Sequence, residues 1–156
     1  MNEIYLLKSN VADYSSFLEG PCKESIISLS MDQKWTPFIT APSVGVVLRK
    51  SDTLMLNYKF DISGSLRPFF IISENTLKVL GDILLPRGQL IDVNTPSKKK
   101  KFFGYYPTNP IKNCFDKELS TYDVGKHGLM IHTPVLIKNH ITDDYLFSVE
   151  EDIHLS

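Results

Sequence analysis

The sequence predicts an α+β fold built on a mainly antiparallel β-sheet with one or two short helices, in a single domain spanning residues 1–156. Nine prolines and eight glycines divide the chain into short pieces, most of which have the length of a strand. Many of these pieces are apolar or alternate apolar and polar residues, whereas clear helix signals occur once. Many strands with few helices are typical of α+β or mainly-β architectures, in which antiparallel pairing predominates.

The first third of the chain contains several pieces of strand length. Residues 13–18 are expected to form a short helical or irregular turn, which Gly20 and Pro21 end. Residues 35–38 should form an extended aromatic connector, because Pro37 disfavours the helical conformation of the residue before it. The strands expected in this part of the chain are residues 4–8, 26–29, 44–48 and 54–60.

A junction of strand, cap and helix follows at residues 68–81. Four apolar residues lead into Ser73, whose hydroxyl can accept a hydrogen bond from an amide of the first helical turn. Glu74 then lies where the helix dipole favours a negative charge. Leu77 and Leu80 share one helix face, and Gly81 is a plausible stop signal.

The second half of the chain again favours strands. Residues 89–94 and 101–106 alternate at the strand period, and residues 129–132, 135–137 and 145–149 are short apolar runs. Between these two groups, Cys114 and Phe115 form an apolar pair before a polar turn at residues 116–120.

Composition indicates a globular domain of nearly neutral charge. Hydrophobic residues make up 42% of the chain and charged residues 22%, and the formal net charge is −1. Two cysteines exclude a disulfide scaffold, and no cysteine-histidine spacing matches a zinc finger. The sequence has no phosphate-binding glycine loop, nucleophile elbow or HExxH motif, so we expect no cofactor or metal. Without a signal-like N-terminus or a long apolar run, we expect a cytoplasmic protein that does not enter a membrane.

Charge is distributed unevenly along the chain. All 17 lysines and arginines lie at or before Lys138, and residues 139–156 contain five acids and no base. Such a segment can bind a partner of opposite charge, or it can be a solvated tail. Its acids and their neighbouring tyrosine are the candidate partner-binding residues: Asp143, Asp144, Tyr145, Glu150, Glu151 and Asp152.

A basic and aromatic segment at residues 98–106 gives an alternative function. Lysines beside exposed rings suit single-stranded nucleic acid, because the lysines meet phosphates and the rings stack on bases. The residues concerned are Lys98, Lys99, Lys100, Lys101, Phe102, Tyr105 and Tyr106. The competing interpretation is an exposed hairpin loop whose aromatic residues alternate into the core. The balanced net charge favours this second interpretation and makes a nucleic-acid partner the weaker hypothesis.

A third hypothesis is a hydrolase in which Cys114 acts as nucleophile and a histidine as base. No sequence feature lowers the pKa of this thiol, and free cysteines are usually packed inside a protein. The four histidines, His127, His132, His140 and His154, are at no diagnostic spacing. They are better interpreted as surface or hydrogen-bonded core residues.

Several segments resemble, in the same order, immunity proteins of bacterial polymorphic toxin systems, of the immunity protein 11 and immunity protein 43 types. FFIISENTLKVLGD (residues 69–82) is similar to the apolar strand, Ser-Glu and short helix of that family. NCFDKELSTY (residues 113–122) resembles its Asp-x-x-x-Ser turn, and HITDDYLFSVEE (residues 140–151) its closing acidic turn and Phe strand. IYLLKSN near the N-terminus suits the opening strand. The resemblance implies a cytoplasmic protein that binds and blocks the C-terminal domain of a cognate toxin, with no enzymatic activity.

Overall fold

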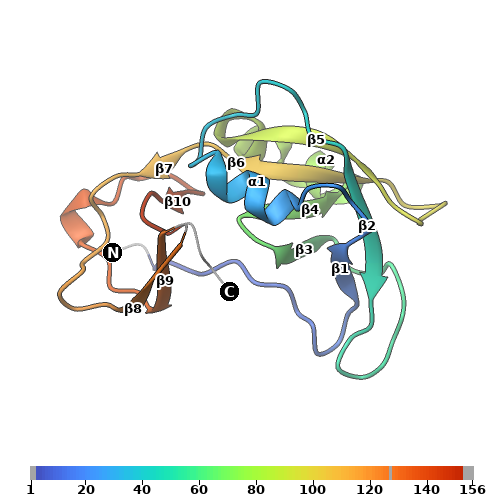
Figure 1. The fold of residues 1–156 in the computed structure, drawn as a ribbon, viewed down its shortest axis with the longest axis horizontal. Helices are drawn as coiled ribbons and strands as arrows, with labels where there is room; N and C mark the ends of the chain where they lie inside the picture. The colour runs from blue at the N-terminus through green and yellow to red at the C-terminus, as the bar shows by residue number, and fades with distance from the viewer. Residues whose placement is uncertain (1–2, 127, 153–156) are drawn as a thin grey trace.

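A computed structural model describes residues 3–126 and 128–152, and it confirms an α+β fold (Figure 1). Six strands form one sheet in the order β1-β2-β5-β6-β4-β3, and every neighbouring pair is antiparallel except β2 and β5. These strands are β1 (Ser16–Glu19), β2 (Val44–Arg49), β3 (Ile62–Leu66), β4 (Phe69–Ser73), β5 (Gly88–Asn94) and β6 (Phe102–Pro107). The predicted predominance of antiparallel pairing is therefore correct.

The remaining elements are short. Strand β7 (Pro110–Ile111) pairs in parallel with β10 (Ser148–Val149), and β8 (Thr121–Gly125) forms an antiparallel hairpin with β9 (Gly128–Thr133). The helices are α1 (Ile26–Asp32), α2 (Glu74–Leu84) and the 3₁₀ turns η1 (Leu85–Arg87) and η2 (Lys138–His140). Among the described residues, no helix has both the length and the apolar character that a membrane crossing requires.

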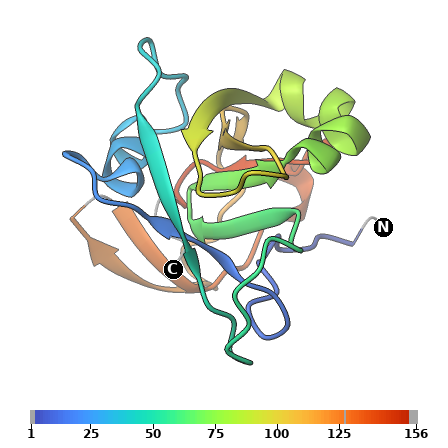
Figure 2. The same cartoon turned by 90° about the vertical axis from the view of Figure 1, so that its right-hand side faces the viewer.

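The large sheet curls until its two edge strands, β1 and β3, lie side by side (Figures 1 and 2). The Phe17 amide of β1 donates to the Ser63 hydroxyl of β3 over 3.0 Å, and both residues are fully buried. The Ser63 hydroxyl thus replaces a backbone carbonyl as the acceptor for the Phe17 amide, because β1 and β3 form no regular ladder here. The sheet is therefore nearly closed.

The inner face of the curled sheet encloses an aromatic core. Phe17 meets the rings of Phe60 and Phe102 edge to face at 5.1 and 5.0 Å. The Tyr106 ring stacks on Trp35 with 6.2 Å between centroids. Helix α1 closes this core through Ile26, which is 3% exposed.

Helix α2 covers the opposite face of the sheet, where Ile72, Leu84 and Tyr105 form a second buried cluster. The predicted junction is confirmed, because β4 ends at Ser73 and the Ser73 hydroxyl accepts from the Thr76 amide at 3.2 Å. The helix does not stop at Gly81 but continues to Leu84, just before Pro86. Nothing at Gly81 itself requires a change of backbone conformation.

Near the N-terminus, the order of the expected helix and strand is wrong. Strand β1 comes first, at residues 16–19, and α1 occupies residues 26–32. Ser25 caps α1, and the Glu19 carboxylate accepts from both the Ser25 hydroxyl and the Ile26 amide. Ile26 and Ser30 are buried on one helix face at a spacing of four residues, whereas Ser28 is exposed. A strand would place all three residues on the same face.

Two other expected strands are also wrong, since residues 4–8 and 54–60 form no strand. The second of these is part of a loop held by Ser51, whose amide donates to the Met55 carbonyl at 3.1 Å and whose hydroxyl accepts from the Met55 amide at 3.0 Å. Leu54 has a φ of 61°, which is incompatible with a strand. Residues 44–48, 89–94, 101–106 and 129–132 form strands as expected, whereas residues 135–137 contribute a single bridge and residues 145–149 only β10.

Candidate partner-binding surface

The acidic segment, defined as residues 141–152, is fixed to the body of the protein by residues distant in the sequence. Arg87, at the end of η1, donates from Nε to Asp144 and from Nη1 to the Ile83 carbonyl. Asn109 donates to the Leu146 carbonyl at 2.6 Å and to Asp144 at 3.4 Å. Leu146 also packs against the apolar cluster beneath α2. Although desolvation opposes the effect, the hydrogen bond and charge of Arg87 hold the pKa of Asp144 below its usual range.

Asp143 and Tyr145 are the exposed residues beside these anchors. The Tyr145 side chain is 84% exposed, whereas its neighbours Asp144 and Leu146 are tied to the protein surface. Asp143 is also exposed. The segment therefore presents one acid and one aromatic ring outward from a fixed backbone.

The second group of acids, at residues 150–152, lies progressively deeper. The Glu150 amide donates to the Ile111 carbonyl, its own carbonyl accepts from the Trp35 indole at 3.0 Å, and its carboxylate pairs with Lys112 at 3.6 Å. Glu151 is half-buried, and its Oε2 atom is buried without a hydrogen-bond partner. Asp152 is 8% exposed; burial raises its pKa to about 7, and the charge of Arg67 acts in the opposite direction.

Of the six candidate residues, then, Asp143 and Tyr145 face solvent freely, whereas Glu150 is half-buried and paired with Lys112. Asp144 pairs with Arg87, Glu151 is half-buried, and Asp152 is buried where the charge of Arg67 acts on it. Arg87 and Asn109, which hold Asp144, were not among the residues predicted from the sequence. No local pattern marks these two residues, because Arg87 lies 57 positions from its partner and Asn109 lies 35.

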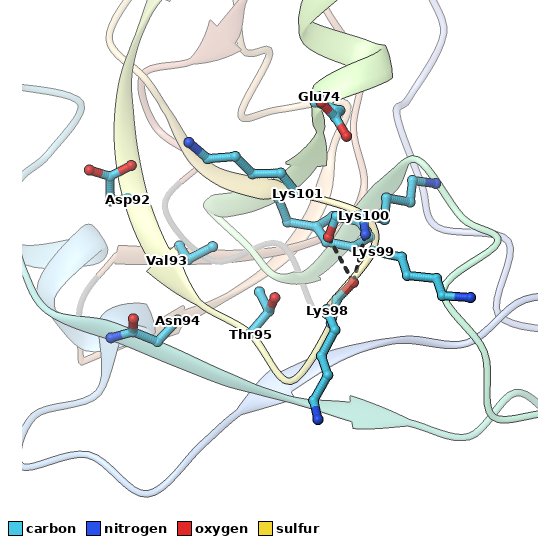
Figure 3. Close-up of a pocket in the computed structure, with 11 residues that line it drawn as sticks. Glu74, Asp92, Val93, Asn94, Thr95, Lys98, Lys99, Lys100 and Lys101 are labelled. Atoms are coloured by element: carbon cyan, nitrogen blue, oxygen red, sulfur yellow. Dashed lines mark hydrogen bonds between the residues drawn. The ribbon is translucent and has the colours of Figure 1, made fainter.

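The four lysines Lys98 to Lys101 lie in the loop of the β5–β6 hairpin, and residues 102–106 lie in β6, as the competing interpretation predicts. Phe102, Tyr105 and Tyr106 are at most 3% exposed, so none of these rings can stack on a base. Lys100 pairs with Asp61 at 2.8 Å and donates to the carbonyls of Tyr58 and Phe60. Lys98, Lys99 and Lys101 are exposed beside Glu74 and Asp92, and the side chains of Lys98 and Lys101 extend away from each other (Figure 3).

Cys114 is fully buried, and desolvation raises the pKa of its thiol, with a further contribution from the charge of Glu151. Its sulfur donates to the Ile111 carbonyl at 3.6 Å. His132 hydrogen-bonds with Asp123 at 2.9 Å, and His140 hydrogen-bonds with the Asn113 carbonyl. His127 and His154 lie outside the described residues. The environment of Cys114 thus opposes formation of the thiolate that a nucleophile needs.

Across residues 3–126 and 128–152, no three histidine, cysteine or acidic side chains gather as a metal site would require. Comparison with protein-family models, curated proteins and solved structures found no match to this chain. The candidate site therefore rests on the chain's own residues: a fixed acidic segment with Asp143 and Tyr145 directed outward.

Proposed function

We propose that this chain is an immunity protein, which binds the C-terminal domain of a cognate bacterial toxin one to one and neutralises it without catalysis. Three segments that resemble immunity proteins support the proposal, namely residues 69–82, 113–122 and 140–151. The last of them carries the exposed residues of the candidate surface, Asp143 and Tyr145.

The exposure of the Tyr145 ring is the observation that carries the proposal. Buried aromatic anchors dominate the binding energy of many protein interfaces, and tyrosine is enriched among them. A ring that is 84% exposed in the free chain can bury most of its surface against a partner. The anchored neighbours Asp144 and Leu146 fix the backbone on both sides of it, so little conformational entropy is lost on binding.

The acids would play different parts in such an interface. The exposed Asp143 and the half-buried Glu150 would attract a basic patch on the toxin, chiefly by raising the association rate. Asp144 would position Tyr145 through its bond to Arg87. Asp152, being nearly buried, would act within the fold.

The test uses the variable C-terminal domain of a large secreted protein encoded beside this gene. We expect the purified domain to form a one-to-one complex with this chain, and co-expression of the chain to abolish its toxicity. Tyr145→Ala should weaken the complex by about 2 kcal/mol or more. Asp143→Lys should slow association and reduce its dependence on salt.

Leu56→Ala is a matched control, since Leu56 is 57% exposed in the loop between β2 and β3, and its variant should bind normally. A complex that tolerates both Tyr145→Ala and Asp143→Lys would exclude this surface. Absence of both complex formation and protection would refute the inhibitor function itself.

A further inference from the structure

A hollow, here called the basic pocket, lies between elements that are far apart in the sequence. It has a volume of about 500 Å³, within the range of pockets that bind small molecules. The N-terminal segment, which runs below β3 from the β8–β9 hairpin toward β1, forms one wall (Figure 1). Helix α1, the end of β2, the β3–β4 turn and β9 form the others. Its lining residues are Lys8, Ser9, Val11, Ile27, Met31, Arg49, Gly64, Ser65, Arg67 and Met130.

The charged side chains that line the basic pocket are all positive. Lys8, Arg49 and Arg67 line it, and no acidic side chain is among the lining residues. Within the described part of the chain, none of these three cations forms an ion pair within 4 Å. The lysine-lined hollow at the β5–β6 hairpin differs, because Glu74 and Asp92 also line it and Lys100 is paired with Asp61.

Arg67 has a hydrogen-bond donor that an anion could use. Its Nη1 atom is buried and has no hydrogen-bond partner among the residues that the structure describes. A buried guanidinium donor without an acceptor loses free energy that an anionic oxygen would restore. Asp152 is an acid whose charge interacts with Arg67, but its pKa of about 7 leaves much of it uncharged near neutral pH. Asp152 therefore compensates only part of the positive charge of the basic pocket.

Apart from Ser9, Gly64 and Ser65, the rest of the lining is apolar. Val11, Ile27, Met31 and Met130 supply aliphatic and thioether groups, and methionine side chains adapt readily to the shape of a ligand. Pockets of this kind combine an apolar surface with a few polar groups that orient the ligand. Three cations beside an apolar surface suit a ligand that carries an anionic head on an apolar body.

We propose that the basic pocket binds a small amphipathic carboxylate, with its head group at Arg49, Arg67 and Lys8 and its hydrocarbon body against Ile27, Met31 and Met130. Arg67 lines the pocket, and its guanidinium would turn toward a carboxylate oxygen, which would give the unpartnered donor an acceptor. Arg49 and Lys8 are exposed and would guide the anion inward. This ligand site goes beyond the proposed inhibition of a toxin, and none of the six candidate partner-binding residues lines it.

The experiment titrates the full chain with decanoate, decanol and decylamine at concentrations where each is monomeric, and follows binding by calorimetry. We expect one saturable site for decanoate, at least about tenfold weaker binding of decanol, and no binding of decylamine. Arg49→Gln and Arg67→Gln should each weaken decanoate binding by about tenfold. Lys99→Gln changes the charge equally at the hairpin hollow and should have no effect.

Several results would overturn the proposal: no saturable binding of decanoate, equal binding of decanol, or unchanged affinity in Arg49→Gln. Since Arg67 is partly buried, Arg67→Gln could fail to fold, and in that event Arg49→Gln and Lys8→Gln decide the outcome. Their side chains are exposed, so we expect thermal melting to show that both variants fold like the native chain. Loss of toxin binding in Tyr145→Ala would leave decanoate binding unchanged, so the two proposals can fail separately.

Discussion

The Tyr106 hydroxyl joins two separate parts of the core. It donates to the Ser30 carbonyl at the end of α1 over 2.7 Å and accepts from the Trp35 amide over 2.9 Å. Tyr106→Phe would keep the ring but leave both buried backbone groups unpaired. We expect a loss of about 1–3 kcal/mol in the free energy of unfolding, measured by urea denaturation.

Tyr14→Phe is the control for this change, because Tyr14 is 40% exposed and should tolerate the loss within about 0.5 kcal/mol. Equal effects of the two substitutions would mean that the Tyr106 hydroxyl contributes nothing specific to the core.

Asp152 makes the stability of the protein depend on pH. Burial raises the pKa of Asp152 to about 7 in the folded chain, above the value of about 3.9 in an unfolded one. The folded state therefore holds its proton more tightly, and the stability gained below pH 4 is lost as pH rises toward 7. The slope reaches at most about 1.4 kcal/mol per pH unit. The side chain of the Asp152→Asn variant cannot ionise. Denaturation at several pH values should therefore show that the free energy of unfolding of the variant rises relative to that of the native chain between about pH 4 and pH 7.

Asp143→Asn provides the comparison for this prediction, since Asp143 is exposed and its variant should follow the native pH profile. Parallel profiles for Asp152→Asn and the native chain would show that Asp152 ionises normally.

Among the elements, those with local signals could be predicted and those that depend on distant contacts could not. Ser73 caps α2 within three residues, and the alternation of β6 is visible in the sequence. Strand β3, with the sequence ISGSL, lacks an apolar run, and its buried Ser63 acquires its role only when β1 arrives beside it. The acidic segment was likewise visible as charge, but its burial and its pairing with Arg87 depend on the completed fold.

Two glycines in neighbouring elements should respond to alanine in opposite directions. A Cβ on Gly104, in β6, would lie 2.2 Å from the Phe69 ring, which is fully buried and cannot move aside. A Cβ on Gly81, within α2, would have no atom nearer than 3.9 Å. Gly104→Ala should therefore cost about 1–3 kcal/mol of unfolding free energy through overpacking. Gly81→Ala should add about 0.5–1 kcal/mol, because alanine favours the helix.

Urea denaturation of both alanine variants measures these effects. A neutral Gly104→Ala would imply that Phe69 can repack, and a destabilised Gly81→Ala would imply that α2 lacks room on that face.

At the scale of the whole molecule, part of the acidic charge near the end of the chain interacts with basic residues of the same chain. Residues 1–138 carry 17 bases and 13 acids, whereas residues 139–156 carry five acids alone. Within that segment, Asp144 pairs with Arg87, Glu150 pairs with Lys112, and the charge of Arg67 acts on Asp152. The acidic segment thus closes onto the basic body, and fewer acids remain for a partner than the sequence suggests.

This closure predicts that the chain unfolds as one unit. Trp35, the only tryptophan, stacks on Tyr106 of the large sheet and donates from its indole to the Glu150 carbonyl of the acidic segment. Its fluorescence therefore reports on both regions, while far-ultraviolet circular dichroism reports on the strands and helices together. The two signals should give coincident transitions in urea, as a cooperative domain does. A fluorescence change at lower urea would instead show that the acidic segment detaches first, leaving Tyr145 on a mobile backbone that could no longer present it rigidly to a toxin.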